Sequence, residues 1–169
     1  MKYFLITGVN GFIGRKLALS LLKKGHKVIG IGRAEVSCLA EIKVENFIYL
    51  QGDLSAFMLK KLDHLAICGL YHLASLQPGK PDLTYDNFYQ SNVVTTLNLL
   101  NYFREKPLDF FLYTSTISVF GSRVNGIINE SSIPRPSDNY GLTKLISEKV
   151  LEFESCKQNC KVIILRLQS

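Results

Sequence analysis

The sequence predicts an α/β fold, a doubly wound parallel sheet of about six strands in the order 3-2-1-4-5-6 with helices on both faces. Two observations favour this fold. Short apolar runs alternate along the chain with helical stretches, and parallel strands need crossover connections of that kind. The strand segments are almost continuously apolar, as in VIILR near the C-terminus, which is typical of strands buried on both faces.

Length and composition indicate one globular domain. The 169 residues are 47% hydrophobic and 20% charged, which excludes a disordered chain and leaves no room for two large domains. The longest apolar stretch, residues 65–76, contains Gly69 and His72 and is shorter than the ~18 residues of a bilayer span. The first residues, MKYFLITG, lack the long apolar core of a secretory signal. We therefore expect no membrane partner.

The formal charge of +6 suits an anionic ligand. The lysine doublets at 23–24 and 60–61 are isolated, however, and no helix-turn-helix or zinc-finger pattern accompanies them. A solvated surface with a cationic bias is favoured over a nucleic-acid interface, so no nucleic-acid partner is expected.

The cysteines and histidines indicate neither disulfides nor a metal site. The four cysteines form no C-x-x-C pair, and the three histidines do not cluster near them. We expect reduced thiols, a cytoplasmic location and no metal. The cysteines are Cys38, Cys68, Cys156 and Cys160.

Each expected element follows from local pattern. The first helix has an apolar stripe at Ile13, Leu17, Leu21 and Leu22, and Gly25 ends it. Ser55 is the expected N-cap of the second helix, and Pro107 limits the third. Strands are expected at residues 2–7, 27–31, 47–50, 70–73, 110–114 and 161–166. Helices are expected at 12–24, 55–62, 82–105 and 139–156, with a loop rich in Ser, Asn and Pro over 121–138.

The turn after the first strand carries a glycine triplet, Gly8, Gly11 and Gly14. Its position between an expected strand and an expected helix is typical of a dinucleotide-binding turn. Glycine permits a tight turn and close backbone approach to a diphosphate, and the helix N-terminus favours that anion. We therefore expect a dinucleotide to bind here.

The end of the second strand bears on the choice between NAD and NADP. An acidic residue there would bind the ribose 2′-hydroxyl, whereas an arginine accommodates a 2′-phosphate. The strand ends in Gly32-Arg33-Ala34, and Glu35 lies past its end. We expect NADP in preference to NAD, with Arg33 binding the phosphate. The alternative is that Arg33 is a solvated residue stacking on the adenine.

Two further segments carry polar side chains near expected strand ends. Asp53 could accept a hydrogen bond from the adenine amine or cap the next helix, and the sequence does not separate these roles. Thr116, after the fifth strand, could hold a substrate oxygen or form a turn.

A catalytic pair is expected at the start of the last helix. Tyr140 and Lys144 are four residues apart and therefore share one helix face. A tyrosine is a weak base at neutral pH, and a nearby ammonium with an oxidised nicotinamide ring is expected to lower its pKa.

Taken together, the segments resemble the extended short-chain dehydrogenase/reductase superfamily, in its NAD(P)-dependent nucleotide-sugar epimerase/dehydratase branch, which has a Rossmann-type fold. The matching segments occur in the family's order and cover almost the whole chain. They are TGVNGFIG (7–14), GDL (52–54), HLAS (72–75), SNVVTT (91–96), TSTISVFG (114–121) and YGLTK (140–144).

The resemblance implies roles for matching positions. Tyr140 would be the catalytic base, Lys144 would bind the nicotinamide ribose and lower the tyrosine pKa, and Thr116 would be the catalytic hydroxyl residue. Asn92 would be structural or close to the cofactor. The remaining cofactor-binding positions implied are Gly8, Gly11, Phe12, Ile13, Gly14, Arg33, Asp53, Leu54, Leu73, Ala74, Ser75 and Thr114.

The chain departs from the family pattern at several positions. Gly32 stands where members that use NAD usually carry an acid, Thr95 where the family often has Gly, and Phe120 where it usually has Tyr. The chain stops at Ser169, where the family continues into a smaller substrate domain. We therefore expect residues 1–169 to form one dinucleotide-binding domain without the C-terminal substrate domain.

The function expected from the resemblance is hydride transfer on a nucleotide-sugar with Tyr140 as general base, by this chain or by an enzyme of which it is the cofactor-binding part. The alternative is a non-catalytic NAD(P)-binding sensor or interaction module. The family resemblance also implies a homodimer, formed as a four-helix bundle from the helices at 82–105 and 139–156.

Overall fold

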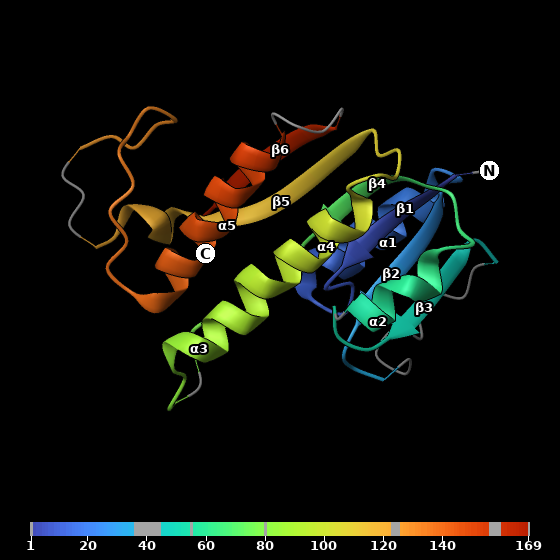
Figure 1. Ribbon diagram of the computed structural model, residues 1–169, viewed down its shortest axis with the longest axis horizontal. Coiled ribbons are helices and arrows are strands. Elements are labelled where there is room, and N and C mark those ends of the chain that lie inside the picture. The colour runs from blue at the N-terminus through green and yellow to red at the C-terminus, as the bar shows by residue number, and fades with distance from the viewer. Residues whose placement is uncertain are drawn as a thin grey trace.

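The computed structural model describes residues 2–35, 45–54, 56–79, 81–122, 126–155 and 160–168. It contains a parallel sheet of order β3-β2-β1-β4-β5-β6 with helices on both faces (Figure 1), which confirms the predicted fold class and strand order. The strands are β1 (Tyr3–Thr7), β2 (Lys27–Gly32), β3 (Phe47–Gln51), β4 (Ile67–His72), β5 (Phe110–Thr116) and β6 (Lys161–Leu167). The helices are α1 (Phe12–Lys23), α2 (Ala56–Leu59), α3 (Tyr85–Phe88), α4 (Thr95–Phe103) and α5 (Asn139–Ser155).

The helices divide between the two faces of the sheet. Helix α1 packs on one face, over a cluster that includes Ile6, Ala18 and Val28. Helices α2, α4 and α5 pack on the other face, over a larger core that includes Leu99 and Leu151. Figure 1 shows α4 and α5 side by side across this second face. None of the described helices is long and apolar enough to cross a bilayer.

The third expected helix is one continuous helical run with a change of winding. A π-helical segment, Tyr89–Val94, joins α3 to α4. The run begins after Thr84, whose hydroxyl accepts a hydrogen bond from the Asn87 amide in a capping box. Asp82 has a positive φ of 65°, so the helix begins later than residue 82, the start predicted. A π-helical turn inside an α-helix often lies at a functional site.

Strand β4 begins earlier than predicted because Gly69 is part of the sheet. A side chain at Gly69 would meet the Phe110 ring at 2.4 Å, so glycine allows the Phe4 and Phe110 rings to cover the strand. Strand β5 extends past residue 114, because Thr116 pairs with Leu167 of β6. The expected N-cap Ser55, the expected helix end at Cys156 and Cys38 lie outside the described residues. Cys68 and Cys160 are free thiols.

Candidate active site

The predicted site residues gather along the carboxyl ends of the strands. The segments that follow the neighbouring strands β1 and β4 run to opposite faces of the sheet. Between such strands lies the crevice where sheets of this type bind ligands. The glycine turn follows β1, and Arg33 and Asp53 follow β2 and β3. Ser75 follows β4, and Thr116 ends β5. The described His, Cys, Asp and Glu side chains form no group of three or more that could hold a metal ion.

The glycine turn is closed against backbone on two sides. Gly8 has a φ of +71°, and a Cβ there would lie 2.7 Å from the Ala74 amide nitrogen. A Cβ on Gly14 would lie 2.3 Å from the Gly8 carbonyl oxygen, so this glycine lets α1 start directly on the turn. The Gly11 amide donates to the Gly8 carbonyl at 2.9 Å. The conformation therefore requires small residues at the turn, as predicted.

The N-terminus of α1 suits an anion. Gly11 is its N-cap, and no side chain caps this end, so the first amides of the helix carry the positive end of its dipole. Phe12 and Ile13 are 76% and 47% exposed beside it. These uncapped amides beside the glycine turn fit the diphosphate of a dinucleotide.

The ends of β2 and β3 place Arg33 and Asp53 in solvent, while Leu54 is buried in the core under α2. Gly32 has no room for a side chain, because a Cβ there would lie 1.5 Å from Asn10 Oδ1. The Tyr49 hydroxyl holds the Asn10 amide in place at 3.1 Å. Asn10 and Tyr49 were not singled out from the sequence, and they occupy the space that an acidic side chain at position 32 would use.

A directional hydrogen-bond chain joins the glycine turn to the π-helical segment. The Ala74 amide donates to Thr7 Oγ1 at 3.2 Å, and Thr7 Oγ1 lies 2.7 Å from His72 Nδ1. On the other side, His72 Nε2 lies 3.1 Å from Thr96 Oγ1, which itself donates to the Asn92 carbonyl at 2.7 Å.

The protons of this chain can be assigned. Thr96 has one hydroxyl proton and gives it to Asn92, so its oxygen accepts from Nε2–H of His72. Nδ1 then accepts from the Thr7 hydroxyl. His72 is fully buried, and burial lowers its pKa to about 3, with the Lys144 charge acting in the same direction. The imidazole is therefore neutral and held in one tautomer between β1 and α4.

The hydrogen bonds from Thr7 through His72 to Thr96 lead to a prediction on stability. Thr96→Val should lower the free energy of unfolding by about 2 kcal/mol, because it leaves the buried Nε2–H of His72 without an acceptor. Thr95→Val is the matched control, since the partly exposed Thr95 hydroxyl bonds only within its own helix, to the Ser91 carbonyl. That change should cost about 0.5 kcal/mol or less. Urea unfolding measures both, and equal losses would contradict the assignment.

Asn92 connects three parts of the site. Its Oδ1 accepts from the Leu76 amide at 2.7 Å and from Ser75 Oγ at 3.1 Å. Its Nδ2 donates to the Leu76 carbonyl and to Thr143 Oγ1. Asn92 is almost fully buried, so its side chain fixes the loop after β4 to α5. These contacts are structural, one of the two roles expected for it.

Tyr140 lies beside two hydroxyl residues from different strands. The hydroxyls of Ser75 and Thr116 lie near its phenol and act to lower the pKa of that phenol. Gly141 allows this approach, because a Cβ there would lie 2.4 Å from the Ser118 carbonyl oxygen. Asp138 caps α5, accepting from the Gly141 amide at 2.6 Å. The start of α5 therefore packs directly on the short 3-10 helix that follows β5.

The hydroxyls of β5 have structural partners as well. Thr116 Oγ1 accepts from the Ser118 amide at 3.1 Å, so Thr116 caps the following turn and also contacts Tyr140. Its contact with Ser118 shows the turn-forming role, and the role of holding a substrate oxygen stays a prediction. Thr114 Oγ1 donates to the His72 carbonyl and joins β5 to β4. Leu73 packs on the α1 side of the sheet, and its amide donates to Thr7.

The lowering of the Tyr140 pKa expected with an oxidised nicotinamide beside it stays a prediction, and the chain's own groups shift that pKa in the opposite direction. Burial raises the pKa of the Tyr140 phenol above its usual value, and the Asp138 charge adds to this. The hydroxyls of Ser75 and Thr116 act on this pKa in the opposite direction and have a smaller effect. Without additional positive charge near the phenol, Tyr140 stays protonated at neutral pH.

Lys144 lies one helical turn after Tyr140 and is 1% exposed. Its ammonium lies 4.1 Å from the centroid of the Tyr113 ring, a cation–π contact. Burial lowers the pKa of Lys144 to about 7, and Glu148 opposes that shift. The sequence showed the Tyr–Lys spacing but neither this burial nor the roles of Tyr113 and Glu148. Helical spacing from Lys144 to Glu148 was the available signal.

Comparisons with known proteins decide the family. The model of the NAD dependent epimerase/dehydratase family matches residues 4–169. The chain belongs to this family. Among its curated relatives in the epimerase/dehydratase family is an uncharacterized UDP-glucose epimerase of Bacillus subtilis (strain 168), 30% identical over 96% of this chain and 54% of that protein. UDP-glucuronate 4-epimerase of Thermodesulfobacterium geofontis is also 30% identical, over 85% of this chain and 48% of that protein.

Solved structures of epimerases share the fold. UDP-glucuronic acid 4-epimerase from Bacillus cereus, in complex with NAD, has a TM-score of 0.85 and 28% identity. That match covers 99% of this chain and 56% of that one. The same enzyme with UDP-glucuronic acid and NAD has a TM-score of 0.86 and 27% identity, covering 97% of this chain and 55% of that one. The chain therefore spans about half the length of the epimerases that it matches.

Proposed function

We propose that residues 1–169 form the dinucleotide-binding domain of an NAD(P)-dependent epimerase or dehydratase that transfers hydride on a nucleotide-sugar. The observation that carries this proposal is that Ser75, after β4, and Thr116, at the end of β5, lie close to Tyr140, at the same edge of the sheet as the glycine turn. Family membership supports it. The UDP-sugar epimerases among the relatives support a nucleotide-sugar as the substrate.

Each half of the site has its own task. The amides at the start of α1, with Gly8, Gly11 and Gly14, would hold the diphosphate. Phe12, Ile13, Leu54, Leu73 and Ala74 would border the cofactor. Arg33 and Asp53 would face its adenosine end. A bound nicotinamide would supply the hydride acceptor and donor, chemistry that protein side chains lack.

The residues of α5 would take part in proton transfer to and from the sugar hydroxyl. Tyr140 would take the proton of a sugar hydroxyl as that carbon loses hydride, and would return it in the reverse step. Ser75 and Thr116 would hold the same oxygen. Because burial and Asp138 raise the pKa of Tyr140, proton removal requires extra positive charge in the crevice. Lys144, one turn away, is the chain's own contribution to that charge.

The choice between NADP and NAD stays a prediction. The exposed Arg33 and the absence of space for an acid at Gly32 support NADP. The preference has no support among the solved relatives named above, which hold NAD. Arg33→Ala should weaken NADPH binding about tenfold and leave NADH binding nearly unchanged. Fluorescence titration of both reduced cofactors measures this, and equal weakening of the two would exclude a phosphate contact.

The same titration tests the function. Wild-type chain should bind a reduced dinucleotide, and absence of binding of either one at millimolar concentration would contradict the proposal. Tyr140→Phe should retain that binding while removing turnover of a nucleotide-sugar by the complete enzyme. A biological effect that survives Tyr140→Phe would instead favour a non-catalytic sensor.

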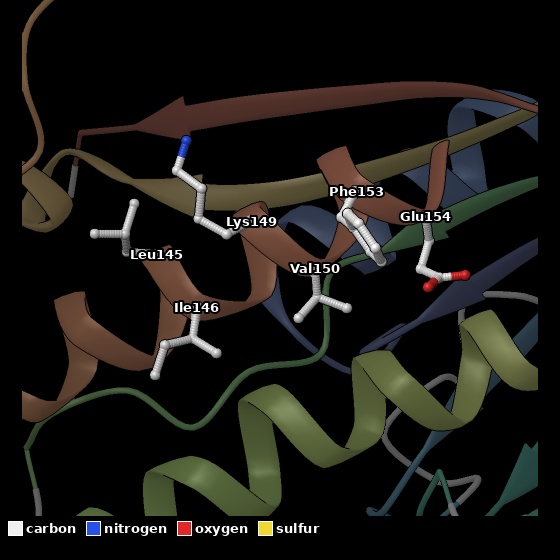
Figure 2. Close-up of a pocket in the computed structure, with 6 residues that line it drawn as sticks. All are labelled: Leu145, Ile146, Lys149, Val150, Phe153 and Glu154. Carbon is white, nitrogen blue, oxygen red and sulfur yellow. The ribbon is translucent and has the colours of Figure 1, made fainter. Parts of the chain in front are cut away.

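We propose a homodimer in which α4 and α5 of two copies form a four-helix bundle. The support is a depression along α5 lined by Leu145, Ile146, Val150 and Phe153 (Figure 2), with Phe153 63% exposed. Burial of such apolar side chains is the usual driving force for association. Phe153→Ser should shift the sedimentation coefficient from dimer to monomer. A wild-type chain that sediments as a monomer would exclude this dimer.

A further inference from the structure

Three charged side chains lie between α5 and the sheet, and they form what we call the buried charge cluster, namely Lys144, Glu148 and Arg166. Glu148 is 0% exposed and Lys144 is 1% exposed. The Arg166 side chain, near the C-terminal end of β6, is 22% exposed. Isolated charges are strongly disfavoured in such a place, so each buried charge needs a compensating group beside it.

Glu148 is held from β6 by a two-pronged contact. Arg166 Nη2 donates to Glu148 Oε2 at 2.7 Å, and Arg166 Nε donates to Oε1 at 3.1 Å. The guanidinium also lies 4.9 Å from the centroid of the Phe120 ring. This geometry fixes the orientation of the carboxylate beside a delocalised cation.

The same carboxylate is the negative charge nearest to Lys144 along the helix. Glu148 follows Lys144 by four residues, so the two lie on one face of α5. On the sheet side, the Lys144 ammonium lies over the ring of Tyr113, whose own hydroxyl has no hydrogen-bond partner within the described part of the chain. A ring face and a carboxylate are thus the groups that compensate the buried ammonium.

We propose that Glu148 is a positioning residue that keeps Lys144 in its ammonium form inside the helix–sheet interface, with Arg166 fixing that carboxylate from β6. This inference deepens the proposed function, on which it rests for the role of Lys144. In the proposed function Lys144 would supply positive charge on the helix face that carries Tyr140, and Glu148 would set whether that charge is present.

The charges around Lys144 fix the direction of the effect. Glu148 acts on Lys144 from α5, the Tyr113 ring contacts it from β5, and the neutral His72 on β4 interacts with its charge. Arg166 on β6 pairs with Glu148. Of these, ionised Glu148 favours the ammonium, while burial opposes it. Removing the Glu148 charge must therefore lower the pKa at which Lys144 loses its proton.

The experiment follows the titration of Lys144 in the whole chain by NMR with 13C-labelled lysine, the signal being assigned with Lys144→Arg. Glu148→Gln should lower the midpoint by about one pH unit or more, a tenfold loss of proton affinity. Glu148→Asp, which keeps the charge, should restore most of the midpoint. Glu152→Gln, an exposed change one turn further along α5, should leave the midpoint unchanged.

A second variant keeps the proposal testable if Glu148→Gln does not fold. Glu148→Gln combined with Arg166→Met removes both partners of the ion pair and avoids an unpaired buried cation. It should lower the Lys144 midpoint in the same direction. A midpoint within 0.3 pH unit (roughly a factor of two in proton affinity) of wild type in either folded variant would overturn the proposal. Since no dinucleotide is present, this result is independent of whether the cofactor binds.

Discussion

Lys144→Met is expected to raise the free energy of unfolding at pH 6 by about 3 kcal/mol or more, while weakening dinucleotide binding at least tenfold. Methionine matches the lysine stem in shape and needs no solvation. The lysine is 1% exposed, and burial lowers its pKa from 10.5 to about 7. A protein that becomes more stable and loses ligand affinity at the same position identifies a residue retained for function.

The pH dependence follows from the same shift. The unfolded chain binds a proton at Lys144 up to a pH near 10.5, whereas the folded chain releases it near pH 7. Between these values the unfolded state holds more protons, so stability rises with pH. The lysine is most destabilising below pH 7. Wild type should therefore gain stability from pH 7 to 10 relative to Lys144→Met.

Urea unfolding of both proteins at several pH values measures this difference. Lys149→Met is the control, because Lys149 lies on the exposed side of α5 with its side chain 61% exposed. It should change stability little and with no such pH dependence. If Lys144→Met and wild type showed a constant difference from pH 6 to 10 (about the window between the two pKa values), the ammonium would not be destabilised by burial.

Gly8→Ala is expected to lower the free energy of unfolding by about 3 kcal/mol or more and to abolish dinucleotide binding. Two costs combine at this position. A left-handed φ of +71° costs about 1 kcal/mol for an alanine. The added Cβ would also lie 2.7 Å from Ala74 N and 2.9 Å from Ala74 Cα, and these backbone atoms cannot move without displacing the loop after β4.

Gly25→Ala separates the two costs. Gly25 has a similar φ of +80°, and a Cβ there would meet nothing within 4 Å. That variant should lose about 1 kcal/mol and bind dinucleotide normally. Equal losses for the two alanines would show that backbone conformation alone, and not the contact between the turn and the loop after β4, requires Gly8.

Local sequence pattern was sufficient to predict the sheet and two parts of the candidate site. The alternation of apolar strands and helices predicted the strand order, because parallel strands have few ways to connect. Glycine spacing predicted a turn that the Gly8 and Gly14 contacts require. Helical periodicity placed Tyr140 and Lys144 on one face of α5. Each of these features depends on residues that are neighbours along the chain.

Packing decided the rest, and the errors in the sequence prediction show why. Strand β4 includes Gly69 because the Phe4 and Phe110 rings cover it, and both residues are distant in sequence. Among the chain's own groups, burial outweighs the neighbouring hydroxyls and raises the pKa of Tyr140, a balance that local spacing does not show.

The link from Thr7 through His72 to Thr96 and the pairing of Glu148 with Arg166 likewise join residues of separate elements. Desolvation and long-range hydrogen bonding depend on which surfaces meet, and that is a property of the assembled fold. For this chain, the positions of the reactive groups follow from local spacing, whereas their protonation states follow from what covers them.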